Sequence, residues 1–138
     1  MPNASSRLVA EFVDAWNAHD VDRIAGLYAS TYEGEDVGEG ERQLGQPGIR
    51  HTIERYLRAF PDFCLMVDRV VAQHDQVALF WTARGVHGGT FINIPPTGRT
   101  VTIRGSSLLT VQGAKITSGL HIWDVAGLLR AMGLLPDL

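Results

Sequence analysis

The sequence is poor in cysteine: Cys64 is the only one among 138 residues, so the chain cannot form an internal disulfide. Cys64 lies in the apolar stretch FCLMV, where no charged neighbour is evident that would favour a reactive thiolate. We therefore expect a buried, unreactive side chain at this position. A metal site would then depend on histidines, and the five present, at positions 19, 51, 74, 87 and 121, show no HxxxH or HxH spacing. The sequence predicts no metal site.

A strong charge of one sign and long apolar runs are also lacking. The formal net charge is -3, and the 12 Lys and Arg residues form no basic stripe, so nucleic acid is not an expected partner. Apolar runs such as VALFW fall far short of the roughly 20 residues that a membrane-spanning helix needs, so no membrane contact is expected. The N-terminal stretch MPNASSRLVAEFV lacks the features of a secretory signal, which predicts a cytoplasmic protein.

Sequence motifs for phosphate binding and serine hydrolysis are missing as well. The glycine-rich stretch GEGERQLGQPG is acidic, and it lacks the flanking strand and the lysine-bearing helix of a phosphate-binding loop. No GxSxG sequence is present to supply a serine nucleophile. These absences predict no cofactor, and they leave general acid–base chemistry by His, Asp or Glu as the remaining kind of catalysis.

The sequence does contain the composition of one globular domain. Apolar residues make up 45% of the chain and charged residues 20%, and the length suits a single domain over 1–138. Apolar residues recur at helical spacing in 7–16 and 49–60, and Asp20 can cap a second short helix between them. The segment 32–48, rich in glycine and acid, shows no sustained period, so we expect an irregular connection there.

The second half of the chain has the pattern of strands. Segments around 64–72, 76–87, 99–111 and 115–123 are rich in β-branched and aromatic residues, and HDQ, IPPTG and QGAK separate them as turns. A short amphipathic helix is expected over 125–132. Helices followed by a run of strands predict an α+β domain with the helices on one side of an antiparallel meander.

The last expected strand carries the first candidate for a functional residue. Thr117, Gly119, His121 and Trp123 share one face by the period of two. Gly119 leaves space beside the imidazole of His121, as a pocket would need, although a core histidine bonded to a backbone carbonyl fits the pattern somewhat better. Asp124 stands directly before the final helix, where a carboxylate can accept hydrogen bonds from free N–H groups. We therefore expect Asp124 to be a helix cap.

A second group of candidates lies in the acidic connection. Glu35 and Asp36 follow the expected helices in a glycine-rich stretch that can carry their side chains to the mouth of a cavity. Carboxylates in apolar surroundings can act as acids or bases near neutral pH. A solvated acidic loop is the simpler interpretation on local evidence. Ser107 would place one hydroxyl on an apolar strand face, where a core serine and a ligand contact are equally compatible with the pattern.

Four stretches, taken together, are similar to a known family: AWNAHDVDRIAGLYASTY, GTFINIPPTGRTV, GSSLLTVQGAKI and HIWDVAGLLRAMGLLP. They resemble the SnoaL-like polyketide cyclases, within the superfamily of nuclear transport factor 2 and ketosteroid isomerase. The resemblance covers about 7–136 and implies a cone-shaped α+β barrel of N-terminal helices packed on a strongly curved antiparallel sheet, with a short C-terminal helix. It also implies a deep apolar cavity and a homodimer that pairs outer sheet surfaces, where Leu120 and Ile122 are expected.

The resemblance further implies roles for individual positions. In the cyclases an aspartate of the last strand is the acid and base of an intramolecular aldol closure, and here that position holds His121. The position of the base in ketosteroid isomerases corresponds approximately to Asp36 in this chain. The positions of their oxyanion-hole tyrosine and protonated aspartate hold Phe12 and Ser107 here, so both strong hydrogen-bond donors are missing. Steroid isomerisation is therefore disfavoured, whereas an imidazole can still remove an acidic proton from between two carbonyls.

The resulting hypothesis is a cofactor-independent cyclase, or a related lyase or isomerase, that acts on a hydrophobic, carbonyl-rich small molecule such as a polyketide intermediate of secondary metabolism. His121 would be the acid and base, with Asp36 or Glu35 orienting it or sharing the proton. Aromatic side chains would form the cavity walls, and polar ones would place substrate oxygens. The walls are assigned to Phe12, Trp16, Phe60, Trp81 and Trp123, and the oxygen contacts to Tyr32, His87 and Ser107. The alternative is a non-catalytic protein on the same fold that binds a small molecule or a partner protein.

Overall fold

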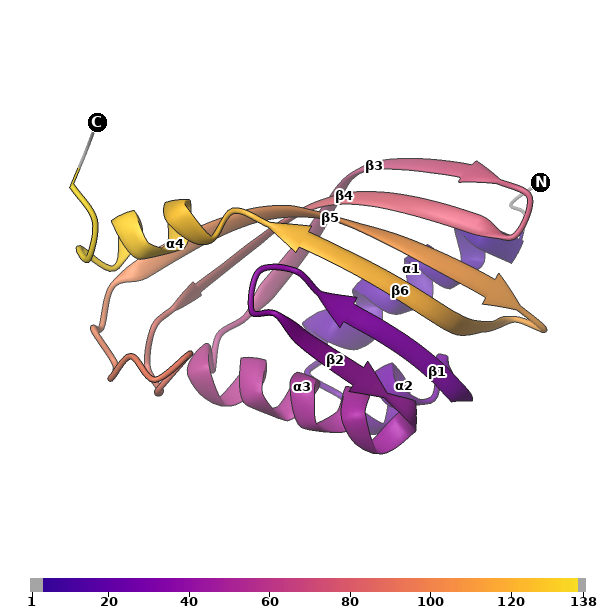
Figure 1. Cartoon of the computed structure of the whole chain (residues 1–138), viewed down its shortest axis with the longest axis horizontal. Coiled ribbons are helices and arrows are strands. Elements are labelled where there is room, and N and C mark those ends of the chain that lie inside the picture. Colours follow the sequence, from indigo (N-terminus) through magenta and orange to yellow (C-terminus); the bar gives the residue numbers. More distant parts are fainter. Residues whose placement is uncertain (1–3, 137–138) are drawn as a thin grey trace.

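The computed structural model describes residues 4–136, which form four helices and six strands (Figure 1). The helices are α1 (Ala4–Asn17), α2 (Val21–Ala25), α3 (Gly45–Ala59) and α4 (Val125–Ala131). The strands are β1 (Tyr28–Asp36), β2 (Glu41–Leu44), β3 (Cys64–Gln73), β4 (Gln76–Val86), β5 (Thr100–Gln112) and β6 (Lys115–Trp123). The predicted α+β class and the order of elements in the second half of the chain are confirmed.

Local sequence explains where the helices begin and end. The side chain of Asp20 accepts a hydrogen bond of 3.1 Å from the backbone N–H of Arg23 and thereby caps α2, as the sequence predicted. The carboxylate of Asp124 accepts a hydrogen bond of 2.9 Å from the N–H of Gly127 at the start of α4. The predicted capping role of Asp124 is therefore confirmed. No described helix has the length and apolar character that crossing a membrane would require.

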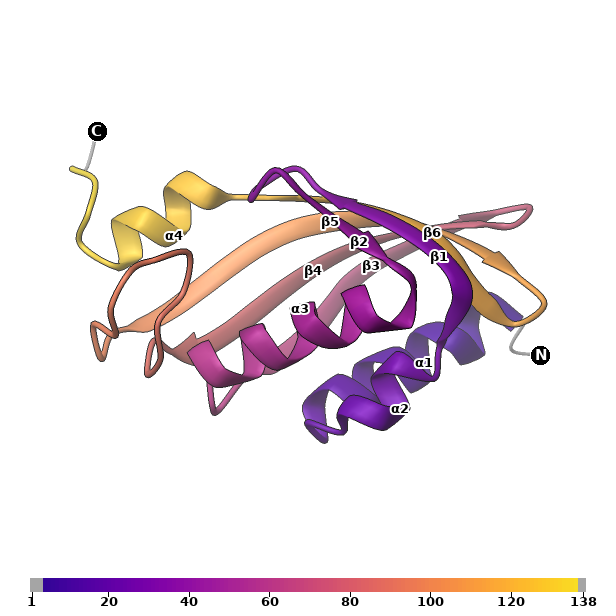
Figure 2. The same ribbon diagram turned by 60° about the horizontal axis from the view of Figure 1, so that its bottom comes forward.

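The strands form one curved sheet in the order β2-β1-β6-β5-β4-β3. Every neighbouring pair is antiparallel except β1 and β6, which run parallel, so the sheet is mixed and not wholly antiparallel. Helices α1 and α3 lie against the concave face, α2 packs against both of these helices, and α4 lies at one end of the sheet against β5 (Figure 2). This arrangement is a cone whose open side is covered by helices.

The expectation of an irregular connection over 32–48 was wrong, because β1, β2 and the start of α3 occupy this segment. Burial does alternate along the end of β1: Tyr32, Gly34 and Asp36 are buried, while Glu33 and Glu35 are exposed. The buried positions hold a phenol, a glycine and a carboxylate, so no apolar period marks the strand in the sequence. The strand is held instead by parallel pairing with β6 and antiparallel pairing with β2.

The prediction for Cys64 was also wrong, because its side chain is exposed. Cys64 is the first residue of β3, and the next residue, Leu65, is the one that faces the core with 6% of its surface exposed. Successive side chains of a strand point to opposite faces, so the burial of Leu65 turns Cys64 outward.

Candidate active site

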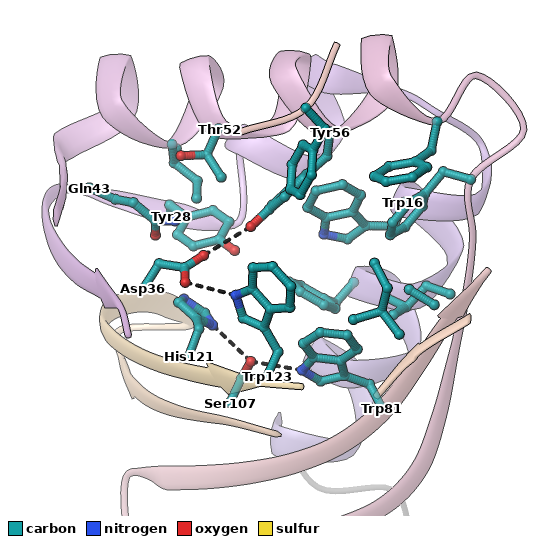
Figure 3. Close-up of a pocket in the computed structure, with 18 residues that line it drawn as sticks. Trp16, Tyr28, Asp36, Gln43, Thr52, Tyr56, Trp81, Ser107, His121 and Trp123 are labelled. Carbon is teal, nitrogen blue, oxygen red and sulfur yellow. Dashed lines mark hydrogen bonds between the residues drawn. The ribbon is translucent and has the colours of Figure 1, made fainter. Parts of the chain in front are cut away.

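The cone contains a partly open cavity of about 110 Å³ between α1, α3 and the sheet (Figure 3). Its walls are mainly aromatic and aliphatic, and its polar groups gather on one side. The lining residues with hydroxyl, amide, carboxylate or imidazole groups are Tyr28, Asp36, Gln43, Thr52, Tyr56, Ser107 and His121. An enclosed apolar cavity of about 150 Å³ holds benzene. This cavity is smaller but open to solvent on one side, so a single ring can enter it with part of the molecule in the opening.

The Asp36 carboxylate, at the end of β1, is the most completely held polar group of the site, and the residue is 2% exposed. Its Oδ1 accepts hydrogen bonds from the indole Nε1 of Trp123 at 2.8 Å and from the backbone N–H of Glu39 at 3.1 Å. Its Oδ2 accepts a hydrogen bond of 2.9 Å from the hydroxyl of Tyr56. These three donors compensate the carboxylate for the water it loses on burial.

Tyr56 is in turn held by a partly buried ion pair between Arg55 and Glu39. Its hydroxyl lies 3.2 Å from Oε2 of Glu39 as well as near Asp36, so one proton is shared between two carboxylates. Arg55 makes hydrogen bonds of 2.5 and 2.6 Å to Glu39 and fixes the position of that carboxylate. Burial, together with the charges of Asp36 and Glu39, raises the pKa of Tyr56 well above its ordinary value. The phenol therefore keeps its proton and acts as a donor to the site.

His121 lies beside Asp36, its partner in the parallel register of β1 and β6. The Nδ1 atom of His121 is 2.8 Å from the hydroxyl oxygen of Ser107, which also accepts a hydrogen bond of 3.0 Å from Trp81 Nε1. The Nε2 atom of His121 is 3.3 Å from the hydroxyl of Tyr32, which donates to Oε1 of Gln43 at 2.9 Å. Both ring nitrogens therefore have protein partners.

The protons of this network can be assigned by counting donors. Tyr32 has one hydroxyl proton and gives it to Gln43, so Nε2 of His121 carries a proton and donates to the Tyr32 oxygen. Nδ1 of His121 then has a lone pair, and the Ser107 hydroxyl donates to it. Burial lowers the pKa of His121 from its usual 6.5, and the charge of Asp36 opposes this shift. At neutral pH the imidazole is neutral and has its basic lone pair on Nδ1.

Gly119 makes room for this arrangement. A Cβ atom at Gly119 would lie 2.7 Å from the Tyr32 hydroxyl oxygen and 2.9 Å from Nε2 of His121. These distances are too short for any side chain, so only glycine lets the phenol and the imidazole meet. The sequence predicted space beside the imidazole at this glycine, and the structure places the Tyr32 hydroxyl there.

The structure brings most of the sequence-predicted site residues to the cavity. The lining includes Phe12, Trp16, Asp36, Phe60, Trp81, Ser107, His121 and Trp123. Tyr32 does not line it but lies behind His121, which it contacts through Nε2. Glu35 is exposed, because it is next to Asp36 in β1 and so points to the opposite face of the sheet. Of the two carboxylates, only Asp36 belongs to the site.

His87 also lies away from the cavity that the sequence assigned to it. Its side chain is fully buried, and its Nδ1 accepts a hydrogen bond of 3.2 Å from the backbone N–H of Thr97 and lies 3.0 Å from the Thr97 hydroxyl. Its backbone is bonded to Arg99 and Gly98. His87 therefore holds the turn over 88–98 closed, and it is not a contact for a ligand in the cavity.

Sequence reasoning missed Tyr56, Gln43 and Thr52. Tyr56 lies within the helix predicted over 49–60, where the apolar period accounts for its ring but does not reveal the role of its hydroxyl. That hydroxyl acquires its role only when α3 packs against β1 and brings it to Asp36, 20 residues away in sequence. Gln43 lies in β2, a strand that the sequence pattern did not indicate. No local signal could have marked these residues as part of the site.

The fold and the cavity together define a class of protein: a helix-covered, curved sheet that encloses a small-molecule site with a carboxylate and an imidazole on one wall. A sequence model of the SnoaL-like polyketide cyclases matches residues 6–132. The chain belongs to this SnoaL-like polyketide cyclase family, as the resemblance of its sequence motifs indicated.

Solved structures agree with this assignment. AclR from Streptomyces galilaeus, a candidate hydroxylase, is 28% identical with a TM-score of 0.84, over 96% of this chain and 86% of that one. IdmH from Streptomyces antibioticus, a candidate polyketide cyclase, is 25% identical with a TM-score of 0.79, over 93% and 97% of the two chains. TsrD from Streptomyces laurentii, at 22% identity and a TM-score of 0.86 over 96% of each chain, shares the fold. A sequence search of curated proteins finds no match.

Proposed function

We propose that the protein catalyses cofactor-independent proton transfer in a ring closure or isomerisation of a hydrophobic, carbonyl-rich small molecule, such as a polyketide intermediate. The observation that carries this proposal is that the Asp36 carboxylate and the His121 imidazole, on paired positions of β1 and β6, line one wall of an apolar cavity and interact electrostatically. Membership of the cyclase family and the likeness to IdmH, a candidate polyketide cyclase, support a substrate of the polyketide type. The proposal assigns the acid and base role to His121 and the supporting charge to Asp36.

The first step begins with the Ser107 hydroxyl, which Trp81 holds in place by its indole N–H. When a substrate carbonyl enters, this hydroxyl turns from Nδ1 of His121 to donate to the carbonyl oxygen. The freed lone pair of Nδ1 removes a proton from the carbon next to that carbonyl. The electrons of the broken C–H bond move into an enolate, whose oxygen keeps the hydrogen bond from Ser107.

The charge that appears on His121 is stabilised by its neighbour. The imidazolium formed by the proton transfer lies beside the Asp36 carboxylate, whose charge favours the protonated ring. In a ring closure the enolate carbon attacks a second carbonyl of the same molecule, and the resulting alkoxide takes the proton back from Nδ1. The proton removed in the first step is thus returned in the last, and no cofactor is consumed.

The pH dependence of this chemistry is set by the lowered pKa of His121. The base is the neutral imidazole, so the rate should be constant near neutral pH and fall as the pH drops through the pKa of His121, below 6.5. The measurement is deuterium exchange at the central carbon of acetylacetone in heavy water, followed by NMR above the buffer rate. An acid limb centred above pH 6.5 would contradict this assignment.

A binding protein without catalysis is the second candidate, and one observation favours it. Both ring nitrogens of His121 are bonded to protein side chains, so the imidazole is already satisfied before a ligand arrives. In this case the wild-type protein would bind ring-sized carbonyl compounds but would not accelerate the exchange of acetylacetone. The exchange assay therefore separates the two functions.

We further propose that the protein forms a homodimer through the outer face of its sheet. Exposed apolar side chains gather there on neighbouring strands, and the strand register places Leu108 opposite Leu120. Phe80 and Ile122 lie on the two sides of Ser106, so the four side chains form one patch. Exposed apolar patches of this kind are typical of protein interfaces. The family resemblance implies the same pairing of sheets.

Substituting Leu108 by Glu should convert the dimer to a monomer, because it would place two charges in the apolar centre of the interface. Sedimentation equilibrium measures the mass, and circular dichroism checks that the variant stays folded. Leu135→Glu is the matched control, since Leu135 is also exposed but follows α4, away from the sheet. A wild-type protein that sediments as a monomer would overturn the proposal.

A further inference from the structure

Trp16 has an indole N–H that is buried without a hydrogen-bond acceptor in the described part of the chain. The residue lies in α1, lines the cavity and is only 7% exposed. Its neighbours offer aromatic rings: the ring centroids of Phe63, Phe12 and Tyr56 lie 5.2, 6.2 and 6.4 Å from that of Trp16. A buried N–H with no acceptor costs free energy, so such a group calls for an explanation.

The other two tryptophans of the chain show what is unusual about Trp16. All three line the same cavity. Trp81 donates its indole N–H to Ser107 at 3.0 Å, and Trp123 donates its indole N–H to Asp36 at 2.8 Å. Both of these bonds lie on the polar side of the cavity. Trp16 lies on the opposite side from His121, and its nitrogen points toward the middle of the cavity (Figure 3).

We propose that Trp16 is a specificity residue, and that its indole N–H binds a second acceptor oxygen on the ligand. The ligand would then be a ring-sized molecule with oxygen at both ends. One carbonyl would meet Ser107 and His121, and a carbonyl, ether or hydroxyl oxygen at the remote end would meet Trp16. The orientation of this ligand rests on the proposed function, whereas the acceptor contact at Trp16 does not.

An unpaired N–H in the cavity wall lets the site distinguish ligands that carry an acceptor oxygen from ligands that do not. A cavity that buries a free donor rejects a ligand without a matching acceptor, because the donor then stays unpaired in apolar surroundings. A purely hydrocarbon end would therefore bind less well than an oxygenated end of the same shape. Trp16 thereby restricts the substrate class to carbonyl compounds that are oxygenated on the side remote from the reacting carbon.

Two phenols of nearly the same shape test this contact. The remote group of para-hydroxyacetophenone is a carbonyl, while that of para-isopropylphenol is a hydrocarbon. The wild-type protein should bind the ketone about 5- to 10-fold more tightly, as expected for one neutral hydrogen bond. Trp16→Phe keeps an aromatic ring but removes the N–H, so it should abolish this preference. Calorimetry measures all four dissociation constants.

A second test measures binding to the wild-type protein alone, and variants are needed only to assign its signals. Its three indole N–H groups give separate signals in a nitrogen–proton correlation spectrum, assigned with single Trp→Phe variants. The ketone should move the Trp16 signal downfield, and the isopropyl compound should not. The signals of Trp81 and Trp123, whose N–H groups are already bonded, are the internal controls.

Several results would overturn the proposal. Equal affinity for the two phenols in wild-type protein, an unchanged preference in Trp16→Phe, or a Trp16 signal unmoved by bound ketone would each do so. Failure of both phenols to bind would also count against it, because the cavity is of ring size. The acetylacetone exchange assay separates a failure of the Trp16 proposal from a failure of the proposed catalytic function. Exchange without the phenol preference refutes only the Trp16 contact, and the preference without exchange refutes only catalysis.

Discussion

His121→Gln is expected to lower the rate of acetylacetone exchange by about 100-fold or more, because glutamine cannot take up the proton that the imidazole accepts. The amide of glutamine still offers a donor and an acceptor toward Ser107 and Tyr32, so the fold and the affinity for ring-sized ligands should persist. The measurement is the rate of acetylacetone exchange in heavy water, at a pH where the wild-type rate no longer changes with pH.

The matched control is His51→Gln. His51 is exposed on α3, so the same change of residue type there should leave the exchange rate unaltered. The acid limb of the pH profile should also disappear in His121→Gln, since the group that titrates is gone. If the variant keeps the wild-type rate while remaining folded, His121 is not the base.

Asp36→Asn is expected to damage both stability and activity. Three donors converge on the carboxylate, and an amide can accept at only one of its two terminal atoms. The Tyr56 hydroxyl can donate to Glu39 instead, but the bonds from Trp123 and from the Glu39 N–H then go to a neutral oxygen. The loss of charge-assisted bonding should lower the free energy of unfolding by about 1–3 kcal/mol. Denaturant unfolding, followed by circular dichroism, measures this loss.

The same variant tests the electrostatic role of Asp36. Its charge raises the pKa of His121 against the effect of burial, so removing the charge should lower that pKa further. The acid limb of the exchange profile should then move to lower pH, while the plateau rate falls about 10- to 100-fold because the imidazolium is no longer stabilised. A purely structural role would lower stability without moving the acid limb.

Glu35→Gln is the control for Asp36→Asn. Glu35 is the next residue in β1, has the same charge and was an equally good candidate in the sequence, but its side chain is exposed on the other face. Its substitution should change the free energy of unfolding by no more than about 0.5 kcal/mol and leave the exchange rate unaltered. A loss of exchange in Glu35→Gln equal to that in Asp36→Asn would refute the choice between the two carboxylates.

The sequence by itself predicted the elements whose residues have a clear apolar period. The helices around 7–16 and 49–60, the four later strands and the caps at Asp20 and Asp124 follow from residues close together in the chain. The same local period placed His121 and Trp123 on one face of β6, and both line the cavity. Local periodicity suffices for most of these elements because each buries one face of its own sequence. β3 is largely exposed, and its β-branched residues marked it as a strand instead.

Only the tertiary structure decided which polar groups form the site. The buried face of β1 carries polar residues and glycine, so its strand character and the inward turn of Asp36 depend on pairing with β6. Trp123 reaches Asp36 across 87 residues of sequence, and Tyr32 reaches His121 across 89. The Tyr32 contact also sets the tautomer of the imidazole, and the packing around α1 leaves the N–H of Trp16 without an acceptor among residues 4–136. A hydrogen bond depends on distances between atoms, and atoms so far apart in the chain meet only when the whole sheet closes over the helices.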